Sequence, residues 1–358
     1  MAMSESPANI TDQYTGRWIE ADLVPGGDQP LAREQVRIWH DSGYAFVAGL
    51  LPGSLVETLI DSVTRAVPRP GSEDSERFTG FGSKLSFPSP LAGFNELTLE
   101  PGLLAAVAQL LSVPVCQLRL TQSTAWPKYG RKRREGGRND NQDQRIHVDY
   151  PNHTLVHPPE WSRPEAVEII VYLGDVETAG GPTAVVPRAG PEDPLYQWPI
   201  VDTPGVGELD YVNDKAAAEA YLAVQRPEIA SWRAQLYRSE RYVHFHAGDV
   251  LLYRHDTWHR GTPMTEGKLR LAHNLTFRRA DAEWISTLHA GWAWSAYRPD
   301  KFFEKLIARA SLDQRAVLGF PQPGSHYWTP ATIKAVEARH GPFGMDMTPY
   351  RAALAHRD

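Results

Sequence analysis

A β-prone segment at residues 145–150 holds a histidine and an aspartate two residues apart, His147 and Asp149. Successive side chains of a strand alternate between its faces, so these two would project from one face while Ile146 and Val148 face the other way. An imidazole beside a carboxylate supplies two of the three ligands in the two-histidine, one-carboxylate set that suits Fe(II). The pair predicts a metal site if a second, distant histidine joins it.

His259 is the distant histidine whose surroundings fit this role best. The turn Gly248-Asp249 leads into an apolar strand at 250–254, and His259 follows on the next extended piece. A further turn then returns the chain along 268–277. We expect His259 to complete the metal site from a neighbouring strand. Its alternative role is that of a buried histidine bonded to a backbone carbonyl.

Arg270 lies eleven residues after His259, across the turn at 263–267. Antiparallel pairing would return Arg270 to the level of His259. 2-Oxoglutarate chelates iron through its C1 carboxylate and keto oxygen, which leaves its C5 carboxylate for a guanidinium to hold through two hydrogen bonds. The pattern therefore predicts 2-oxoglutarate as a cosubstrate used with O2, unless Arg270 is a surface ion-pair partner.

A His-x-His pair offers a competing metal site. His244 and His246 could bind zinc together with His255, with Asp249 and Asp256 nearby. The set lacks a carboxylate at strand spacing, so a zinc hydrolase is the weaker hypothesis. Two histidine pairs have the four-residue spacing of a helical zinc site, but Pro, Gly and Thr residues around them argue against helix. These pairs are His255 with His259 and His153 with His157.

From Val113 onward, short β-prone runs are bounded by turn residues. Few helix-length segments separate them, which argues against a parallel sheet with crossover helices and favours an antiparallel double-sheet barrel. A helical insertion interrupts the series at about 205–240. The predicted strands are 115–126, 145–150, 167–173, 183–187, 241–246, 249–254, 257–260 and 269–277.

The flanking segments are predicted to be mostly helical. Residues 1–30 look like a loose leader, residues 68–96 like a long loop, and the chain after about Gly319 loop-like again. We predict one domain, 1–358, that is mainly β with flanking helices. Its parts are a helical buttress with loops at 1–112, a jelly-roll core at 113–280 and a mostly helical tail at 281–358.

At this point the sequence resembles the phytanoyl-CoA dioxygenase family of Fe(II)/2-oxoglutarate-dependent oxygenases. Residues 39–51, Trp-His-Asp-Ser-Gly-Tyr-Ala-Phe-Val-Ala-Gly-Leu-Leu, resemble its N-terminal entry, and 173–187 resemble its block ending in Val-Pro. The segment 188–190 departs from it, with Arg-Ala-Gly in place of Gly-Ser-His. The resemblance implies a double-stranded β-helix (jelly-roll, cupin-like) core. The implied roles are metal binding by His147, Asp149 and His259, and cosubstrate binding by Arg270.

The strand before the His-x-Asp pair supplies the pocket candidates. Side chains of one parity there face the cosubstrate by resemblance, or otherwise pack as a polar face against the helical layer. Asn274 shares a face with Arg270 and is a further candidate. The predicted cosubstrate residues are Gln122, Thr124 and Asn274, and the predicted substrate residues are Tyr150, Asn152, Trp126 and Lys128.

Six basic residues crowd the segment from Lys128 to Arg138. The functional interpretation is a mobile lid that recruits an anionic substrate, such as a CoA thioester or a phosphate ester. The alternative is a solvated hairpin loop.

Composition narrows the class of protein. The single cysteine, Cys116, excludes an intramolecular disulfide and a cysteine-based zinc site. A net charge of −6 argues against nucleic acid and anionic membranes as partners. The chain has no apolar run of about 20 residues and no secretion signal at its start, so we expect a soluble, cytoplasmic protein.

The predicted function is Fe(II)/2-oxoglutarate-dependent hydroxylation of an unactivated C–H bond in a small molecule, with release of succinate and CO2. Halogenation is disfavoured because Asp149 occupies the position that related halogenases leave to chloride. The alternatives are the same iron chemistry ending in desaturation, epimerisation or ring closure, and a cupin-like protein that binds a small ligand or metal without oxidising anything.

Overall fold

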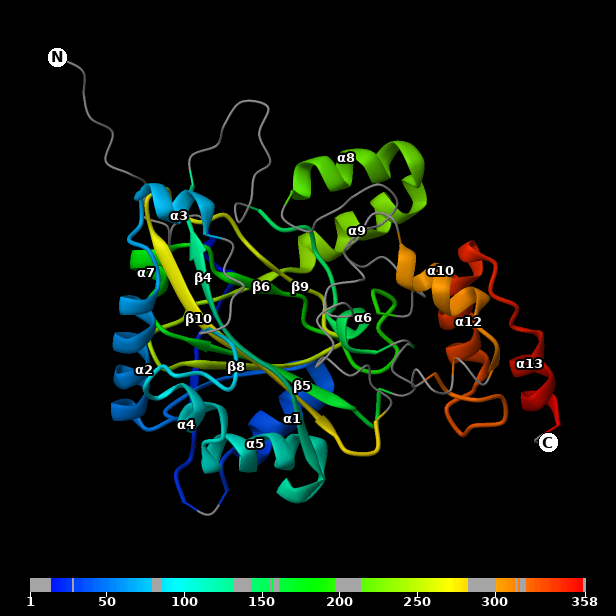
Figure 1. The fold of residues 1–358 in the computed structure, drawn as a ribbon, viewed down its shortest axis with the longest axis horizontal. Coiled ribbons are helices and arrows are strands. Elements are labelled where there is room, and N and C mark those ends of the chain that lie inside the picture. The colour runs from blue at the N-terminus through cyan, green and yellow to red at the C-terminus, as the bar shows by residue number, and fades with distance from the viewer. Residues whose placement is uncertain are drawn as a thin grey trace.

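The computed structural model describes most of the chain as two β-sheets surrounded by helices (Figure 1). The expected strands at 115–126, 167–173 and 269–277 are found with slightly different ends. The run 166–172 is rich in Val and Ile, which suit a pleated, buried surface. The described residues are 14–27, 29–78, 85–131, 143–154, 156, 161–196, 214–282, 301–312, 315 and 320–356.

The larger sheet has six strands in the order β2-β3-β8-β5-β10-β4. Its pairs are antiparallel except the edge pair β2 and β3. The central strand β5 is buried along its whole length. The strands are β2 (Asp22–Leu23), β3 (Tyr44–Ala48), β8 (Val250–Arg254), β5 (Ala166–Tyr172), β10 (Leu269–Arg279) and β4 (Leu118–Tyr129).

The smaller sheet has four strands in the order β1-β7-β6-β9, with β1 parallel to β7. Side chains of both sheets, among them Val185, Phe46 and Tyr172, meet in one apolar cluster, so the sheets face each other. This two-sheet arrangement is consistent with a jelly-roll core. The strands are β1 (Trp18–Ile19), β7 (Arg241–Val243), β6 (Thr183–Val185) and β9 (His259–Gly261).

Amphipathic N-terminal helices cover the outer face of the larger sheet (Figure 1). Leu59 and Phe94 from these helices pack on Val167 and Leu252 of the sheet. Gly43 ends α1 with φ of 88°, and a Cβ there would lie 2.7 Å from the Thr257 hydroxyl. The helices are α1 (Arg33–Ser42), α2 (Gly53–Ala66), α3 (Glu73–Arg77), α4 (Phe94–Thr98), α5 (Pro101–Leu111) and the 3-10 turn η3 (Val115–Gln117).

The remaining helices lie beside the smaller sheet and at one side of the molecule (Figure 1). Two of them, α8 (Lys215–Gln225) and α9 (Pro227–Ser239), form the expected insertion. The C-terminal helices build an apolar cluster of their own, which Val156 of the body joins. They are α10 (Phe302–Arg309), α12 (Pro330–His340), the 3-10 turn η5 (Gly341–Phe343) and α13 (Thr348–Ala355); the short α6 (Tyr150–His153) and α7 (Val176–Ala179) complete the set.

Four predictions about elements are wrong. Within the expected leader at 1–30, β1 and β2 pair with sheet strands. The expected loop at 68–96 contains α3. The tail after about 319 contains α12 and α13 instead of a loop. Residues 145–150 form a single bridge rather than a strand.

The division into one domain stays a prediction.

Candidate metal centre

The three predicted metal ligands converge. One potential ligand atom from each of His147, Asp149 and His259 lies within 4.8 Å of the other two. His147 and His259 are brought side by side by an isolated antiparallel bridge, whose two backbone hydrogen bonds are both 2.9 Å long. Asp149 precedes α6 directly. Residues more than a hundred positions apart in the chain therefore meet at one point.

Asp149 was predicted to lie in a strand, and this prediction is wrong. Its side chain nevertheless lies beside those of His147 and His259, as predicted. The backbone N–H groups of Asp149 and Tyr150 both donate to the carbonyl of His255, at 3.0 and 2.9 Å. These bonds turn the chain out of the extended conformation, and Pro151 suits the first turn of the helix that follows. The carboxylate is therefore positioned by a helix start.

Backbone carbonyls fix the orientation of both imidazoles. His147 Nδ1 donates to the carbonyl of Arg145 at 2.9 Å, and His259 Nδ1 donates to that of Thr257 at 3.0 Å. A carbonyl only accepts hydrogen bonds, so each Nδ1 carries a proton, and Nε2 is the nitrogen of each neutral ring that can bind a metal. The Nε2 atoms lie 3.8 Å (His147) and 3.3 Å (His259) from oxygens of Asp149.

The electrostatics suit a divalent cation. Burial, followed by the nearby His259, lowers the pKa of His147 to about 3, so its imidazole is neutral. Burial alone would raise the pKa of Asp149, but His259 and His147 outweigh it and the net shift is downward. Tyr253 donates its hydroxyl to Asp149 at 2.9 Å. The centre therefore offers two imidazole nitrogens and one carboxylate, the donor set that suits Fe(II).

A cavity of about 100 Å³ adjoins these side chains. The larger sheet lines it with residues of β4, β5, β8 and β10, and the smaller sheet contributes Thr183 of β6 and the residues of β9. The predicted pocket residues on this wall are Gln122, Trp126, Lys128, Arg270 and Asn274.

Three predicted pocket residues do not lie on this wall. Thr124 is absent from the lining, and its hydroxyl lies 3.5 Å from that of Ser86. Tyr150 packs instead in an apolar cluster with Trp258. The side chain of Asn152 lies outside the described residues.

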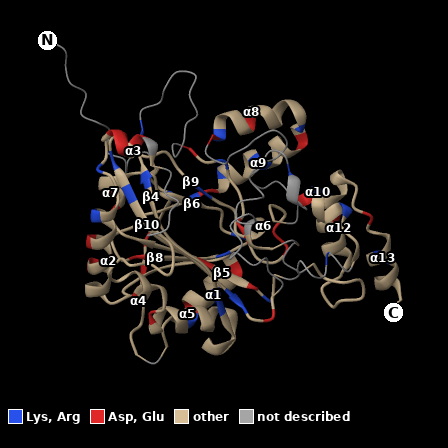
Figure 2. Cartoon of the chain, in the orientation of Figure 1, with Lys and Arg blue, Asp and Glu red and all other residues tan. Residues whose placement is uncertain are grey.

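One end of the cavity is rich in hydrogen-bond donors. The Cα atoms of Arg270 and Lys128 are paired across β10 and β4, so their side chains project from the same face. Arg270 Nη1 donates to the carbonyl of Gly181 at 2.5 Å, while its Nε has no hydrogen-bond partner among the described residues. Figure 2 shows basic positions on both strands.

The lid interpretation of the basic segment is wrong for its first residues. Lys128 is a strand residue inside the cavity, and its side chain is only 3% exposed. Arg131 donates to the carbonyls of Ser75 and Phe78 at 3.0 and 2.9 Å, so it holds the segment against the helical layer. Residues 132–138 lie outside the described residues.

The opposite end of the cavity holds polar residues that the sequence interpretation missed. Glu168 is buried on β5, and its Oε1 lies 3.5 Å from His153 Nε2. Thr276 donates its hydroxyl to the other carboxylate oxygen. Burial, and then the charge of Asp149, raise the pKa of Glu168 well above its usual value, while burial lowers that of His153 to about 4.

The competing histidine site takes a different form from the one predicted. His244 and His246 gather with Glu177 at the surface, and His255 is not part of this cluster. His244 already contacts Glu20 at 2.8 Å and Glu177 at 2.6 Å. These contacts engage both ring nitrogens of His244. The cluster is therefore explained by a protonated His244 side chain held between two carboxylates.

Comparisons with known proteins find solved structures that are similar at low sequence identity. No protein-family model matches the sequence, and no curated protein matches it. EvdO2 from Micromonospora carbonacea var. aurantiaca is 17% identical with a TM-score of 0.48, over 72% of this chain and 94% of that one. The residues described above, rather than these similarities, support the function proposed below.

Two other solved structures are similar at a comparable level. The non-heme alpha ketoglutarate dependent carbocyclase SnoK from nogalamycin biosynthesis is 16% identical with a TM-score of 0.47, over 72% of this chain and 89% of that one. EctD from S. alaskensis, solved with 2-oxoglutarate and 5-hydroxyectoine, is 16% identical with a TM-score of 0.46, over 72% of this chain and 80% of that one.

No helix in the described part of the chain is long and apolar enough to cross a membrane.

Proposed function

We propose that this chain is an Fe(II)/2-oxoglutarate-dependent oxygenase built on a jelly-roll core. The observation that carries the proposal is the convergence of His147, Asp149 and His259 beside a cavity whose far wall presents Arg270. Two imidazole nitrogens and a carboxylate oxygen that lie within 4.8 Å of one another can hold one metal cation between them. A neighbouring guanidinium without a carboxylate partner among the described residues suits an anionic cosubstrate.

Each residue has a defined task in this proposal. His147, Asp149 and His259 hold the iron, and Arg270 receives the C5 carboxylate of 2-oxoglutarate. The bound iron supplies the oxidising chemistry with O2, as 2-oxoglutarate becomes succinate and CO2. Tyr253 keeps the Asp149 carboxylate oriented through its 2.9 Å hydrogen bond.

The proposed outcome is hydroxylation of an unactivated C–H bond in a small molecule. Asp149 fills the carboxylate position of the site, which disfavours halogenation. Desaturation, epimerisation and ring closure need only a different placement of the substrate relative to the same centre.

We place the substrate towards Glu168, because Arg270 commits the other end of the cavity to the cosubstrate. Glu168 Oε1 has no hydrogen-bond partner among the described residues, so it can accept a hydrogen bond from a hydroxyl or amine. Because the pKa of Glu168 is raised well above its usual value, its carboxyl group can also be protonated and donate a hydrogen bond. This placement favours a substrate with a neutral polar group, such as a hydroxyl, at that end, in contrast to the anionic substrate inferred from the basic segment.

Anaerobic titration with Fe(II) and then 2-oxoglutarate tests the proposal, followed by exposure to O2 and measurement of succinate. We expect one Fe(II) per chain and 2-oxoglutarate binding that depends on the metal. Asp149→Ala should abolish tight Fe(II) binding, because it removes the anionic ligand, whereas the surface variant His246→Ala should leave it unchanged.

The alternatives give different results in the same experiment. A non-oxidative binding protein would take up metal and form no succinate with or without added small molecules. A zinc enzyme built on the surface cluster would lose its metal in His246→Ala and keep it in Asp149→Ala.

A further inference from the structure

The segment that carries His147 is bound to a strand on one side only. His147 exchanges both of its backbone hydrogen bonds with His259 of β9. In an extended segment the N–H and C=O groups of the adjacent residue point to the opposite side, so those of Ile146 face away from β9. The described part of the chain offers no strand on that side. Buried backbone groups need partners, so another element must supply them.

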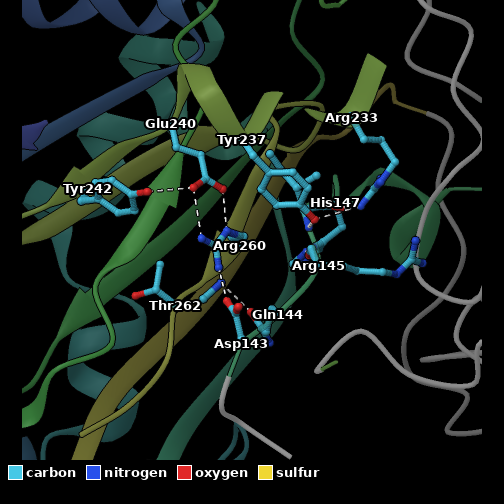
Figure 3. Close-up of polar contacts among 12 residues, drawn as sticks. Asp143, Gln144, Arg145, His147, Arg233, Tyr237, Glu240, Tyr242, Arg260 and Thr262 are labelled. Carbon is cyan, nitrogen blue, oxygen red and sulfur yellow. Dashed lines mark hydrogen bonds and ion pairs between the residues drawn. The ribbon is translucent and has the colours of Figure 1, made fainter. Parts of the chain in front are cut away.

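Helix α9 takes the place of the missing strand. Arg233 and Tyr237, four residues apart on one face of α9, both reach the backbone of Ile146 (Figure 3). Arg233 Nη2 donates to the Ile146 carbonyl at 2.9 Å, and the Ile146 N–H donates to the Tyr237 hydroxyl at 3.0 Å. Glu219 of α8 accepts from Arg233 Nε at 2.8 Å and from Tyr237 at 2.6 Å, and so holds both side chains in place.

The side chain of Ile146 also rests on α9. It is fully buried and packs in an apolar cluster with Trp232 and Leu236 of that helix. The backbone and the side chain of the residue before His147 therefore both depend on the position of α9.

The end of α9 holds the residue beside the second histidine. Glu240 follows the helix directly and accepts from Arg260, from Nε at 2.5 Å and from Nη2 at 3.1 Å (Figure 3). Arg260 is the residue after His259, and it also pairs with Asp143. The ion pair of Glu240 with Arg260 is buried, so neither partner can be removed without leaving the other charge uncompensated.

We propose that α9 positions the metal centre, because it holds the residue adjacent to each metal-binding histidine and thereby sets how His147 and His259 lie relative to each other. This inference rests on the proposed function. Arg233, Tyr237 and Glu240 are positioning residues, since none of them is among the described residues that line the cavity. Docking of the α8–α9 insertion and metal binding are then coupled, and the coupling acts in both directions.

The test measures binding of Co(II), a divalent cation that suits the same donor set and reports its ligand geometry through visible absorption. Tyr237→Phe leaves the Ile146 N–H without its acceptor. It should weaken Co(II) binding about 10-fold, the lower end of the range for residues that orient metal ligands, and change the spectrum of bound Co(II). Tyr129→Phe is the matched control, because it also removes a buried hydroxyl, one that donates to the carbonyl of Pro68 at 2.7 Å. It should alter neither affinity nor spectrum.

A second pair of variants tests the same contact from the carbonyl side. Arg233→Met should weaken Co(II) binding about 10- to 100-fold. Arg233→Lys keeps a cationic donor and should recover part of that loss. Arg238→Met removes an exposed arginine of the same helix and should leave Co(II) binding unchanged.

Hydrogen exchange of the wild type tests the reverse direction of the coupling. Binding of Co(II) should slow amide exchange along α9. A helix with a structural role alone would show exchange that Co(II) does not change, and Tyr237→Phe would then lower the melting temperature as Tyr129→Phe does, with Co(II) affinity and spectrum intact. Either result overturns the inference alone. Wild-type protein whose Co(II) binding is absent, or survives Asp149→Ala, overturns the proposed function and this inference with it.

Discussion

The two ends of the cavity are built on the same strand but have opposite polarity. β10 carries Arg270 opposite Lys128 at one end and Thr276 opposite Glu168 at the other. Unpartnered buried atoms at the first end are donors, Lys128 Nζ and Arg270 Nε, whereas Glu168 Oε1 at the second is an acceptor. One end offers hydrogen-bond donors and the other end offers an acceptor. Two chemically different ligands can therefore bind in the cavity, each at the end that complements it.

The two ends also differ in what supports them. The donor end rests on paired strands, whose register sets the positions of both cations. The acceptor end depends partly on α6, the short helix that carries His153. Arg339 of α12 donates to the carbonyls of Thr154 at 2.7 Å and Pro151 at 3.3 Å, so the C-terminal helices hold α6 in place.

The largest expected effect is at the donor end. Arg270→Met should weaken 2-oxoglutarate binding roughly 30-fold or more, because truncating one member of a buried charge pair typically costs about 2–5 kcal/mol. Anaerobic calorimetry on the Fe(II)-loaded variant measures this, with Arg163→Met as an exposed control. Binding within a few-fold of wild type would mean that the cosubstrate does not lie at this end.

The support of α6 is tested by Arg339→Met. We expect a loss of about 1–3 kcal/mol in the free energy of unfolding, because two buried carbonyls lose their donor. Fe(II) affinity should fall as Asp149, at the start of α6, loses its fixed position. Urea unfolding and Fe(II) titration check these effects, and Arg351→Met, at an exposed ion pair of α13, is the control. Unchanged Fe(II) affinity would show that α6 keeps its position without the hydrogen bonds from Arg339.

The pH dependence of stability should differ in sign between the two ends. The pKa of Lys128 is lowered in the folded protein from 10.5. Between that lowered pKa and 10.5 the unfolded chain binds more protons, so this lysine makes stability rise with pH. The pKa of Glu168 is raised from 4.5, so between 4.5 and the raised pKa the folded protein binds more protons and stability falls with pH.

Urea unfolding of the metal-free protein across this range measures both slopes. Each group contributes at most about 1.4 kcal/mol per pH unit. The free energy of unfolding of the wild type minus that of Lys128→Met should rise with pH. The same difference taken with Glu168→Gln should fall with pH. If both stability differences changed with pH in the same direction, the two ends would not have opposite effects on the pH dependence of stability.

The smallest effect expected is that of Glu168→Gln on cosubstrate binding. The variant keeps the size of the side chain and acts at the end away from Arg270, so 2-oxoglutarate affinity should stay within about threefold of wild type, as for well-separated sites. A larger change, measured by the same calorimetry, would place the cosubstrate nearer to Glu168 and reverse the assignment of the ends.

The parts of the site that were predictable follow local patterns. The strand parity of Gln122 and Trp126 placed both on the cavity wall. The expected antiparallel pairing of the strands of His259 and Arg270 is wrong, because β9 lies in the smaller sheet and β10 in the larger one, although both residues line the cavity. Convergence with His147 required the chemistry of the ligand set as well, since no local rule connects positions so far apart.

The parts that were missed depend on tertiary packing. Burial of Lys128 follows from the partner strand and from Gly261, which its own neighbours in sequence do not reveal. Glu168 did leave a signal, as the lone charge in the apolar run Ala166–Tyr172. In the tail, prolines suggested loops, but Pro330 occupies the first turn of α12, where its missing N–H costs nothing.

The close approach of Gly261 and Lys128 bears on how position 261 can change. A Cβ there would lie 2.4 Å from Lys128 Nζ and 2.7 Å from Gln144 Oε1, which are the far ends of flexible side chains. A small residue at 261 would therefore be accommodated by a shift of these two groups, and it would move the ammonium group within the cavity without requiring its loss.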